Sequence, residues 1–102
     1  MKRSAHNQTC HDESVRRRVA GLEAAGWYVR ADLPEYDEKP PKLCVDGECA
    51  IPDIYATYGK YTRIIEVETP DTIDKDWKQH NILRRWRNQH NNVEVNIREC
   101  DV

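Results

Sequence analysis

The chain has 102 residues, of which 38% are hydrophobic and 33% charged, and its formal net charge is −2. A chain of this length forms one small domain with a modest core, and because Phe is absent, three Trp and five Tyr must supply the bulky packing. No apolar run is long enough to span a membrane, and the N-terminus lacks the apolar segment of a secretion signal, so we expect a soluble cytoplasmic protein.

The N-terminal part predicts a polar segment followed by a helix. Residues 1–11 are polar, and we expect them to be flexible, ahead of a single domain over residues 12–102. From residue 12 to residue 25 the spacing of apolar side chains predicts a helix, which Gly26 ends. The apolar stripe of this helix comprises Val15, Val19 and Leu22.

Strands follow the first helix. Residues 27–33 predict one strand, and the acidic, proline-rich segment 34–42 predicts an irregular loop. An Asp-Gly pair further along predicts a hairpin with residues 42–45 and 48–58 as its arms.

Residues 61–69 predict the central strand of the sheet. Because side chains alternate between the faces of a strand, Glu66 and Glu68 share one face with Ile64, and the residues between them point the other way. The strand is therefore apolar on both faces apart from two carboxylates. Such a strand is usually covered on both sides, and carboxylates there are costly unless a cation compensates them. Asp53, at the start of the preceding strand, comes near Glu66 if the two strands pair.

Residues 72–90 predict a second helix, and residues 93–98 predict a last alternating strand. The order is then helix, three strands, helix, strand, which predicts an α/β (α+β) fold with a mixed central sheet flanked by helices. Ile73 and Trp77 fall opposite the apolar side of the second helix, next to His80. This pair is a candidate homodimer interface, and the alternative is that the first turn bends and buries both residues.

Pro52-Asp53, followed after a short hairpin by Glu66-Val67-Glu68, resembles the signature of the PD-(D/E)XK nuclease superfamily, which includes restriction endonucleases and archaeal Holliday-junction resolvases. The resemblance covers nearly the whole chain. It implies a restriction-endonuclease-like core and a small Mg²⁺- or Mn²⁺-dependent endonuclease that hydrolyses duplex or branched DNA, with structure-specific or junction-resolving activity. A homodimer with two active sites is expected for such an enzyme. The resemblance also implies that Asp53 and Glu66 bind the metal together with the carbonyl of Val67.

The resemblance has two departures. The family's lysine is replaced by Glu68, as in some type II restriction enzymes, and this glutamate could accept a proton from the attacking water or bind a second metal. The family's acid on the first helix falls in register with Val15, and Glu13 qualifies only if the helix starts after it. Both departures favour the alternative function, a non-catalytic nuclease-like fold that binds nucleic acid or protein.

Gln79 resembles the glutamine that many members of the superfamily place near the scissile phosphate. The alternative is an ordinary capped or solvent-bridged helix glutamine. Basic residues in the two helices are candidates for binding phosphates, and solvated helix faces are the alternative for these. They are Arg16, Arg17, Arg18, Lys78, Arg84, Arg85 and Arg87.

Four cysteines are many for a chain this short. Cys44 and Cys49 bracket the Asp-Gly turn, so they could form a disulfide or half of a structural zinc site, with His6, Cys10 and His11 as the other half. Free thiols are a further alternative for these residues and for Cys100. A structural Zn²⁺ would indicate a zinc-stapled interaction module.

Overall fold

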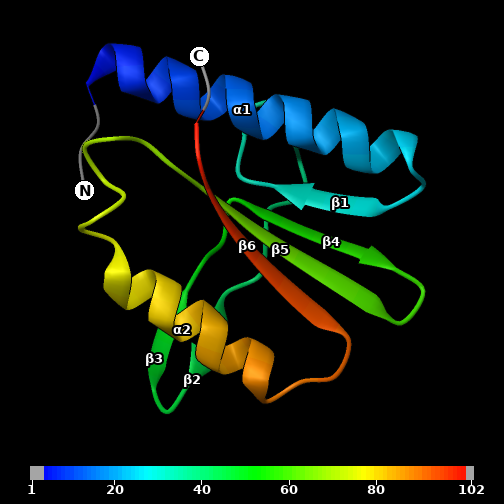
Figure 1. Cartoon of the computed structure of the whole chain (residues 1–102). Coiled ribbons are helices and arrows are strands. Elements are labelled where there is room, and N and C mark those ends of the chain that lie inside the picture. The colour runs from blue at the N-terminus through cyan, green and yellow to red at the C-terminus, as the bar shows by residue number, and fades with distance from the viewer. Residues whose placement is uncertain (1–3, 101–102) are drawn as a thin grey trace.

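The computed structural model describes residues 4–100 and places two helices against a four-stranded mixed sheet (Figure 1). α1 (Ala5–Ala24) covers one face, and α2 (Trp77–Asn88) covers the other together with a two-stranded hairpin. The sheet has the order β1-β4-β5-β6, in which β5 pairs antiparallel with β4 and parallel with β6. The strands are β1 (Tyr28–Ala31), β2 (Leu43–Val45), β3 (Glu48–Ala50), β4 (Ile54–Tyr58), β5 (Tyr61–Glu68) and β6 (Val93–Glu99). The chain is therefore a small α+β domain with a mixed sheet flanked by helices, as predicted.

β5 is an interior strand of the sheet, with apolar side chains on both faces. Ile65 and Val67 pack on the α1 side, in a cluster that includes Val15 and Val19 of the helix. Ile64 packs on the opposite side with residues of α2. The prediction of a strand covered on both faces is confirmed, and Glu66 and Glu68 are buried with Ile64 on the α2 side.

α1 begins at Ala5, seven residues before its predicted start. The side chain of Ser4 caps it by accepting a hydrogen bond from the backbone N–H of Asn7. Ala5 to His11, assigned from the sequence to a flexible segment, therefore form the first turns of the helix. Cys10 and His11 are buried even though they are not part of an apolar repeat.

Two further boundaries differ from the predictions. The arm predicted over residues 48–58 is two strands, β3 and β4, which belong to different sheets and are separated at Ile51 to Asp53. Pro52 lies in this break and has no N–H to donate to a ladder. α2 begins at Trp77 and not at residue 72, because residues 69–76 form turns ahead of it. Trp77 is 62% exposed, in agreement with its predicted position.

All four cysteines form disulfides. Cys10 in α1 is bonded to Cys100, which directly follows β6, and Cys44 is bonded to Cys49 directly across the β2–β3 hairpin. Asp46 and Gly47 at the turn both have positive φ, as the predicted Asp-Gly hairpin requires. The disulfide alternative is the one observed for Cys44 and Cys49, and the alternatives of a zinc site with Cys ligands and of free thiols were wrong. Within residues 4–100, neither helix is long and apolar enough to cross a bilayer.

Candidate functional site

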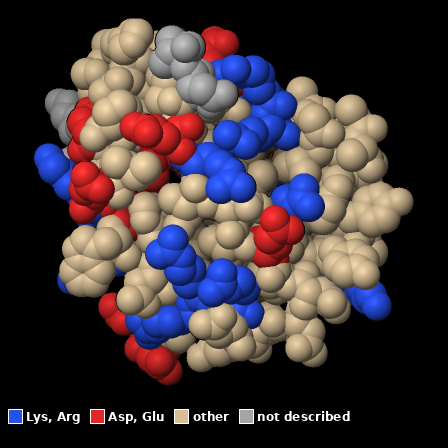
Figure 2. All heavy atoms as spheres, viewed as in Figure 1, with Lys and Arg blue, Asp and Glu red and all other residues tan. Residues whose placement is uncertain are grey.

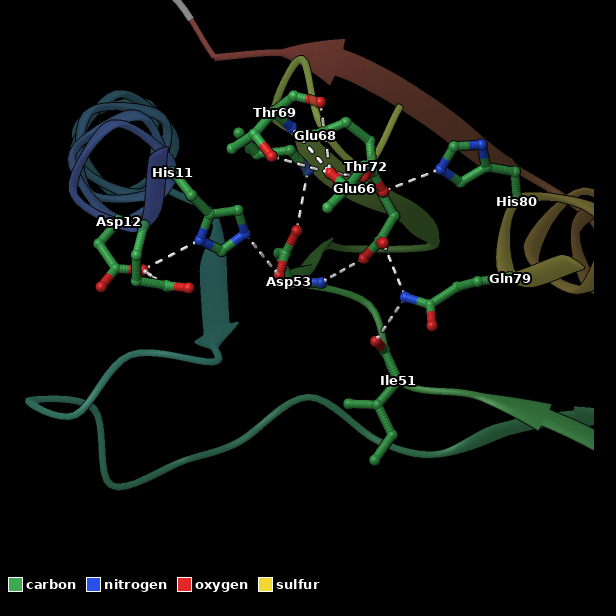
Figure 3. Close-up of polar contacts among 12 residues, drawn as sticks. His11, Asp12, Ile51, Asp53, Glu66, Glu68, Thr69, Thr72, Gln79 and His80 are labelled. Carbon is green, nitrogen blue, oxygen red and sulfur yellow. Dashed lines mark hydrogen bonds and ion pairs between the residues drawn. The ribbon is translucent and has the colours of Figure 1, made fainter. Parts of the chain in front are cut away.

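The candidate site lies where β4 begins and β5 ends. The ladder between these strands reaches Ile54 opposite Ile65, and beyond it side chains bond to backbone across the gap (Figure 3). The N–H of Asp53 donates to Oε1 of Glu66 over 2.7 Å, and the N–H of Val67 donates to Oδ2 of Asp53 over 2.8 Å. The predicted proximity of Asp53 and Glu66 is therefore observed, and the Val67 peptide adjoins both carboxylates.

Gln79 reaches this pair from α2. Its Nε2 donates to Oε2 of Glu66 over 2.7 Å and to the carbonyl of Ile51 over 3.2 Å. Gln79 thus ties the helix to the break before β4 and to the carboxylate on β5. The structure brings it into the site, as the resemblance predicted.

Glu68 has a separate set of neighbours. Its Oε2 accepts a hydrogen bond from the hydroxyl of Thr72 over 2.6 Å, and its Oε1 lies 2.9 Å from Nε2 of His80. Glu68 is fully buried, and Glu66 is only 2% exposed. One potential ligand atom from each of Glu66, Glu68 and His80 lies within 4.8 Å of the others. Predictions made from the sequence included the two glutamates but placed His80 on the far side of the helix.

His11 is a site residue that the sequence reasoning missed. Its Nε2 lies 3.1 Å from Oδ1 of Asp53, and its Nδ1 lies 2.9 Å from Oδ1 of Asp12 (Figure 3). α1 therefore presents an imidazole to Asp53, whereas the nuclease resemblance predicted an acid on this helix. The sequence signal was present, because His11 is four residues before Val15 and so lies on the same helix face.

Glu13, the predicted helix acid, is not brought to the site. Its side chain is 64% exposed, and its Oε1 lies 4.0 Å from Arg16. Because α1 begins at Ala5, Glu13 lies in a regular part of the helix and points away from the buried stripe. The prediction for Glu13 was therefore wrong.

The buried carboxylates repel one another and are poorly solvated. Burial, followed by the charge of Asp53, raises the pKa of Glu66 well above its ordinary value of 4.5. Burial likewise raises the pKa of Glu68, although the hydrogen bonds from Thr72 and His80 oppose this. A cation or a bound proton would therefore stabilise the site.

The donor set fits a hard or borderline divalent cation. Each carboxylate oxygen carries two lone pairs, so the hydrogen bonds to Asp53 and Glu66 leave acceptor capacity for a metal ion. Carboxylate oxygens are the ligands of Mg²⁺ and Mn²⁺, and an imidazole beside them favours Mn²⁺ or another transition metal over Mg²⁺. Asp53, with 14% of its side chain exposed, is the most accessible of the three acids.

The basic residues predicted to bind phosphates divide into two kinds. Arg16 is paired with Glu35 over 2.6 Å, and Arg85 contacts Glu48 and Asp46 over 3.0 and 3.4 Å. These two arginines hold α1 to the acidic loop and α2 to the hairpin. In Figure 2, Lys and Arg gather over the middle of α1 and over α2, and Asp and Glu gather beside the segment between β5 and α2. Phosphate binding stays a prediction for the whole set, which also includes Arg17, Arg18, Lys78, Arg84 and Arg87.

Comparisons of the chain with protein-family models, with curated proteins and with solved structures found no match. The resemblance to the PD-(D/E)XK superfamily therefore rests on the residues of the chain itself.

Proposed function

We propose that the protein is a small metal-dependent endonuclease that hydrolyses phosphodiester bonds in DNA. One observation carries the proposal: Asp53, directly before β4, Glu66 of β5 and Gln79 of α2 are joined by hydrogen bonds. Residues of these types, in this order along the chain, are those the nuclease resemblance assigned to metal and phosphate. The raised pKa of Glu66 supports a cation as the missing partner of the buried charge.

Asp53 and Glu66 would hold the metal. Glu66 also adjoins Glu68 and His80, since one potential ligand atom from each of these three residues lies within 4.8 Å of the others. When bound, a divalent metal supplies positive charge that stabilises the transition state of phosphodiester hydrolysis and makes water a better nucleophile. The protein contributes rigid placement, since the Val67 N–H fixes Asp53 and the Gln79 amide fixes Glu66.

His11 and Glu68 serve as positioning residues in this proposal. His11 lies against Oδ1 of Asp53 and orients that carboxylate from α1. Glu68 is enclosed by Thr72 and His80, so it orients the imidazole next to Glu66. Because Glu68 has no exposed surface, we assign it this role in preference to accepting a proton from the attacking water.

The test is a cleavage panel of duplex, branched and single-stranded DNA and of RNA, run with Mg²⁺, with Mn²⁺ and with EDTA. We expect metal-dependent DNA cleavage that is greater with Mn²⁺ and is lost in Glu66→Gln. The control is Glu99→Gln, which changes an exposed carboxylate on the neighbouring strand. Cleavage that persists in EDTA, or in Glu66→Gln, would overturn the proposal.

A non-catalytic nuclease-like fold that binds nucleic acid or protein is the second candidate. The carboxylates of Asp53, Glu66 and Glu68 are in contact with backbone N–H groups, an amide, a hydroxyl and imidazoles. These groups stabilise the carboxylates without a metal, which favours the non-catalytic fold. Salt-sensitive DNA binding with no cleavage under any metal condition would select it.

Location and assembly remain predictions. Disulfides persist mainly in oxidising compartments and in the cytosol of hyperthermophiles. With the two disulfides, the predicted cytoplasmic location therefore implies the cytosol of a hyperthermophile. A homodimer, which would bring two active sites to two DNA strands, remains our prediction for the assembly.

A further inference from the structure

A pocket of about 490 Å³ lies at the end of the sheet where β5 and β6 begin. This volume is within the range of roughly 300–1,000 Å³ that is usual for small-ligand sites. The candidate carboxylates lie toward the other end of β5: Glu66 is five residues from Tyr61, or about 17 Å along an extended strand. The pocket is thus separate from the proposed catalytic site. Six lining residues matter here: Trp27, Tyr61, Arg63, His90, Asn92 and Glu94.

Aromatic rings form the apolar part of the pocket. Trp27, just before β1, has its ring centroid 5.7 Å from that of Tyr58, so the Trp27 ring packs against a second aromatic ring. Tyr61 is 50% exposed and begins β5. His90 is stacked on Trp86 with the ring centroids 3.8 Å apart. Two of these rings are fixed by ring contacts, and Tyr61 leaves half of its surface to solvent.

Charged groups also line the pocket. The guanidinium of Arg63 lies 4.8 Å from the Trp27 ring, and its Nη2 lies 3.6 Å from Oε2 of Glu94. Nε of Arg63 is buried and has no hydrogen-bond partner among residues 4–100. A buried donor of this kind is costly to leave unpaired, and Arg63 lines the pocket, so a ligand whose acceptor reaches the guanidinium would be favoured. The Glu94 carboxylate next to it favours a ligand that also donates.

We infer that this pocket binds one unpaired nucleobase. A flat ring that stacks on aromatic side chains and carries donors and acceptors on its edge meets both requirements of the site. Nζ of Lys60 lies 5.6 Å from the Tyr61 ring centroid, so a positive charge close to this ring is available to attract the phosphate of a bound nucleotide.

The inference deepens the proposed function and rests on it for the identity of the substrate. If the carboxylates cleave DNA, the substrate class is DNA with an unpaired nucleotide a short distance from the scissile bond, and not continuous duplex. A paired base could not enter the pocket, because its edge is already hydrogen-bonded and its faces are stacked. Base flipping or a single-stranded region is therefore required.

The test measures binding in EDTA, so that cleavage does not enter the result. Fluorescence anisotropy would compare a labelled single-stranded DNA oligonucleotide, the same sequence as duplex, and an oligonucleotide made of abasic residues. Tyr61→Leu removes the stacking ring but keeps an apolar side chain, and Tyr61→Phe keeps the ring. The matched control is Tyr28→Leu, since Tyr28 is 54% exposed but lies outside the pocket.

We expect the single strand to bind more tightly than the duplex or the abasic oligonucleotide. Tyr61→Leu should weaken single-strand binding about fivefold or more, as expected for loss of one base–aromatic stack. Tyr61→Phe and Tyr28→Leu should bind like the parent protein. Equal affinity for the abasic and intact strands, or no effect of Tyr61→Leu, would overturn the inference.

The two proposals fail separately. Tyr61-dependent binding without metal-dependent cleavage would keep this pocket assignment and reject the nuclease. Cleavage that depends on Glu66 but not on Tyr61 would keep the nuclease and reject the pocket assignment.

Discussion

Asp53 and Glu66 hold each other through the backbone. Oε1 of Glu66 accepts the N–H of Asp53, and Oδ2 of Asp53 accepts the N–H of the residue that follows Glu66. The two carboxylates thus continue the β4–β5 pairing after the ladder ends at Ile54. Substitution of either acid therefore alters the backbone that positions the other, and the first test should use the smallest change, carboxylate to amide.

Glu66→Gln should abolish stabilisation by a divalent metal. In the parent protein we expect Mn²⁺ to raise the melting temperature, because binding to the folded state alone stabilises it by mass action. The amide of the variant cannot supply the anionic ligand, so its melting temperature should not change with Mn²⁺. Differential scanning fluorimetry with a Mn²⁺ titration measures this. An equal rise in Glu66→Gln would contradict the assignment of Glu66 as a metal ligand, and Glu99→Gln should keep the full rise.

The metal-free protein should lose stability as the pH rises above the ordinary glutamate pKa. Glu66 has a raised pKa when folded, so at low pH it is protonated in both states and contributes no difference. As the pH passes 4.5, the unfolded state releases this proton first, and the free energy of unfolding falls until the pH exceeds the folded pKa. Urea unfolding of the parent and of Glu66→Gln in EDTA across this window measures the effect.

Glu68 should likewise lower the free energy of unfolding as the pH rises, because its pKa is also raised in the folded protein. The difference in unfolding free energy between the parent and Glu66→Gln isolates the Glu66 term. If that difference does not change with pH, the carboxylate of Glu66 does not cause the loss of stability at higher pH.

His11→Ala should destabilise the metal-free protein by about 1–3 kcal/mol, the usual cost of leaving a buried polar group without its partner. His11 is buried and lies 3.1 Å from Oδ1 of Asp53. His6→Ala is the matched control, because His6 lies on the same helix and is exposed. Chemical denaturation of both variants in EDTA measures the difference. Equal stabilities would mean that the contact with Asp53 contributes nothing to the fold.

Removal of the Cys10–Cys100 disulfide should cost more than removal of Cys44–Cys49. The first links residues separated by 90 positions and the second by 5. Loop-closure entropy then gives about 4–5 kcal/mol for the first and about 2 kcal/mol for the second. The two double Cys→Ser variants, compared by urea unfolding, test the order. Cys10 also precedes His11, so the first variant should weaken the Mn²⁺ effect more than the second.

Trp77→Ser should shift the predicted homodimer toward monomer. Trp77 is 62% exposed at the start of α2, and large exposed apolar side chains often mark interfaces. Size-exclusion chromatography with light scattering at several concentrations measures the mass. Tyr58→Ser, which removes a ring of similar exposure elsewhere on the molecule, should leave the mass unchanged. A parent protein that is monomeric at every concentration would end the dimer prediction.

The part of the site that could be predicted is the part fixed by local pairing. The tight turn at Gly59 sets the β4–β5 register, with Tyr58 opposite Tyr61 and Ile54 opposite Ile65, so the proximity of Asp53 and Glu66 follows by counting. The two buried faces of β5 could also be predicted, because side chains alternate along a strand. The prediction that Gln79 lies near Glu66 needed one more assumption, namely which side of α2 faces the sheet.

The partners of the two histidines could not be predicted from local sequence, because long-range contacts set them. His11 is brought to Asp53 by a helix whose start carries no apolar repeat and whose Cys10 is bonded to a residue 90 positions away. His80 lies at the edge of the apolar arc of α2, where small changes in helix rotation decide between burial and exposure. The burial of His80 depends on its contact with Glu68, and the buried carboxylate of Glu68 in turn requires a hydrogen-bonding partner.

The bond between Cys10 and Cys100 closes residues 10–100 into a covalent ring. A protease that cuts once between them therefore opens the ring without releasing a fragment. Such nicked molecules would run as one species on a non-reducing gel and separate into two pieces after reduction, and the cut protein could keep its folded form meanwhile.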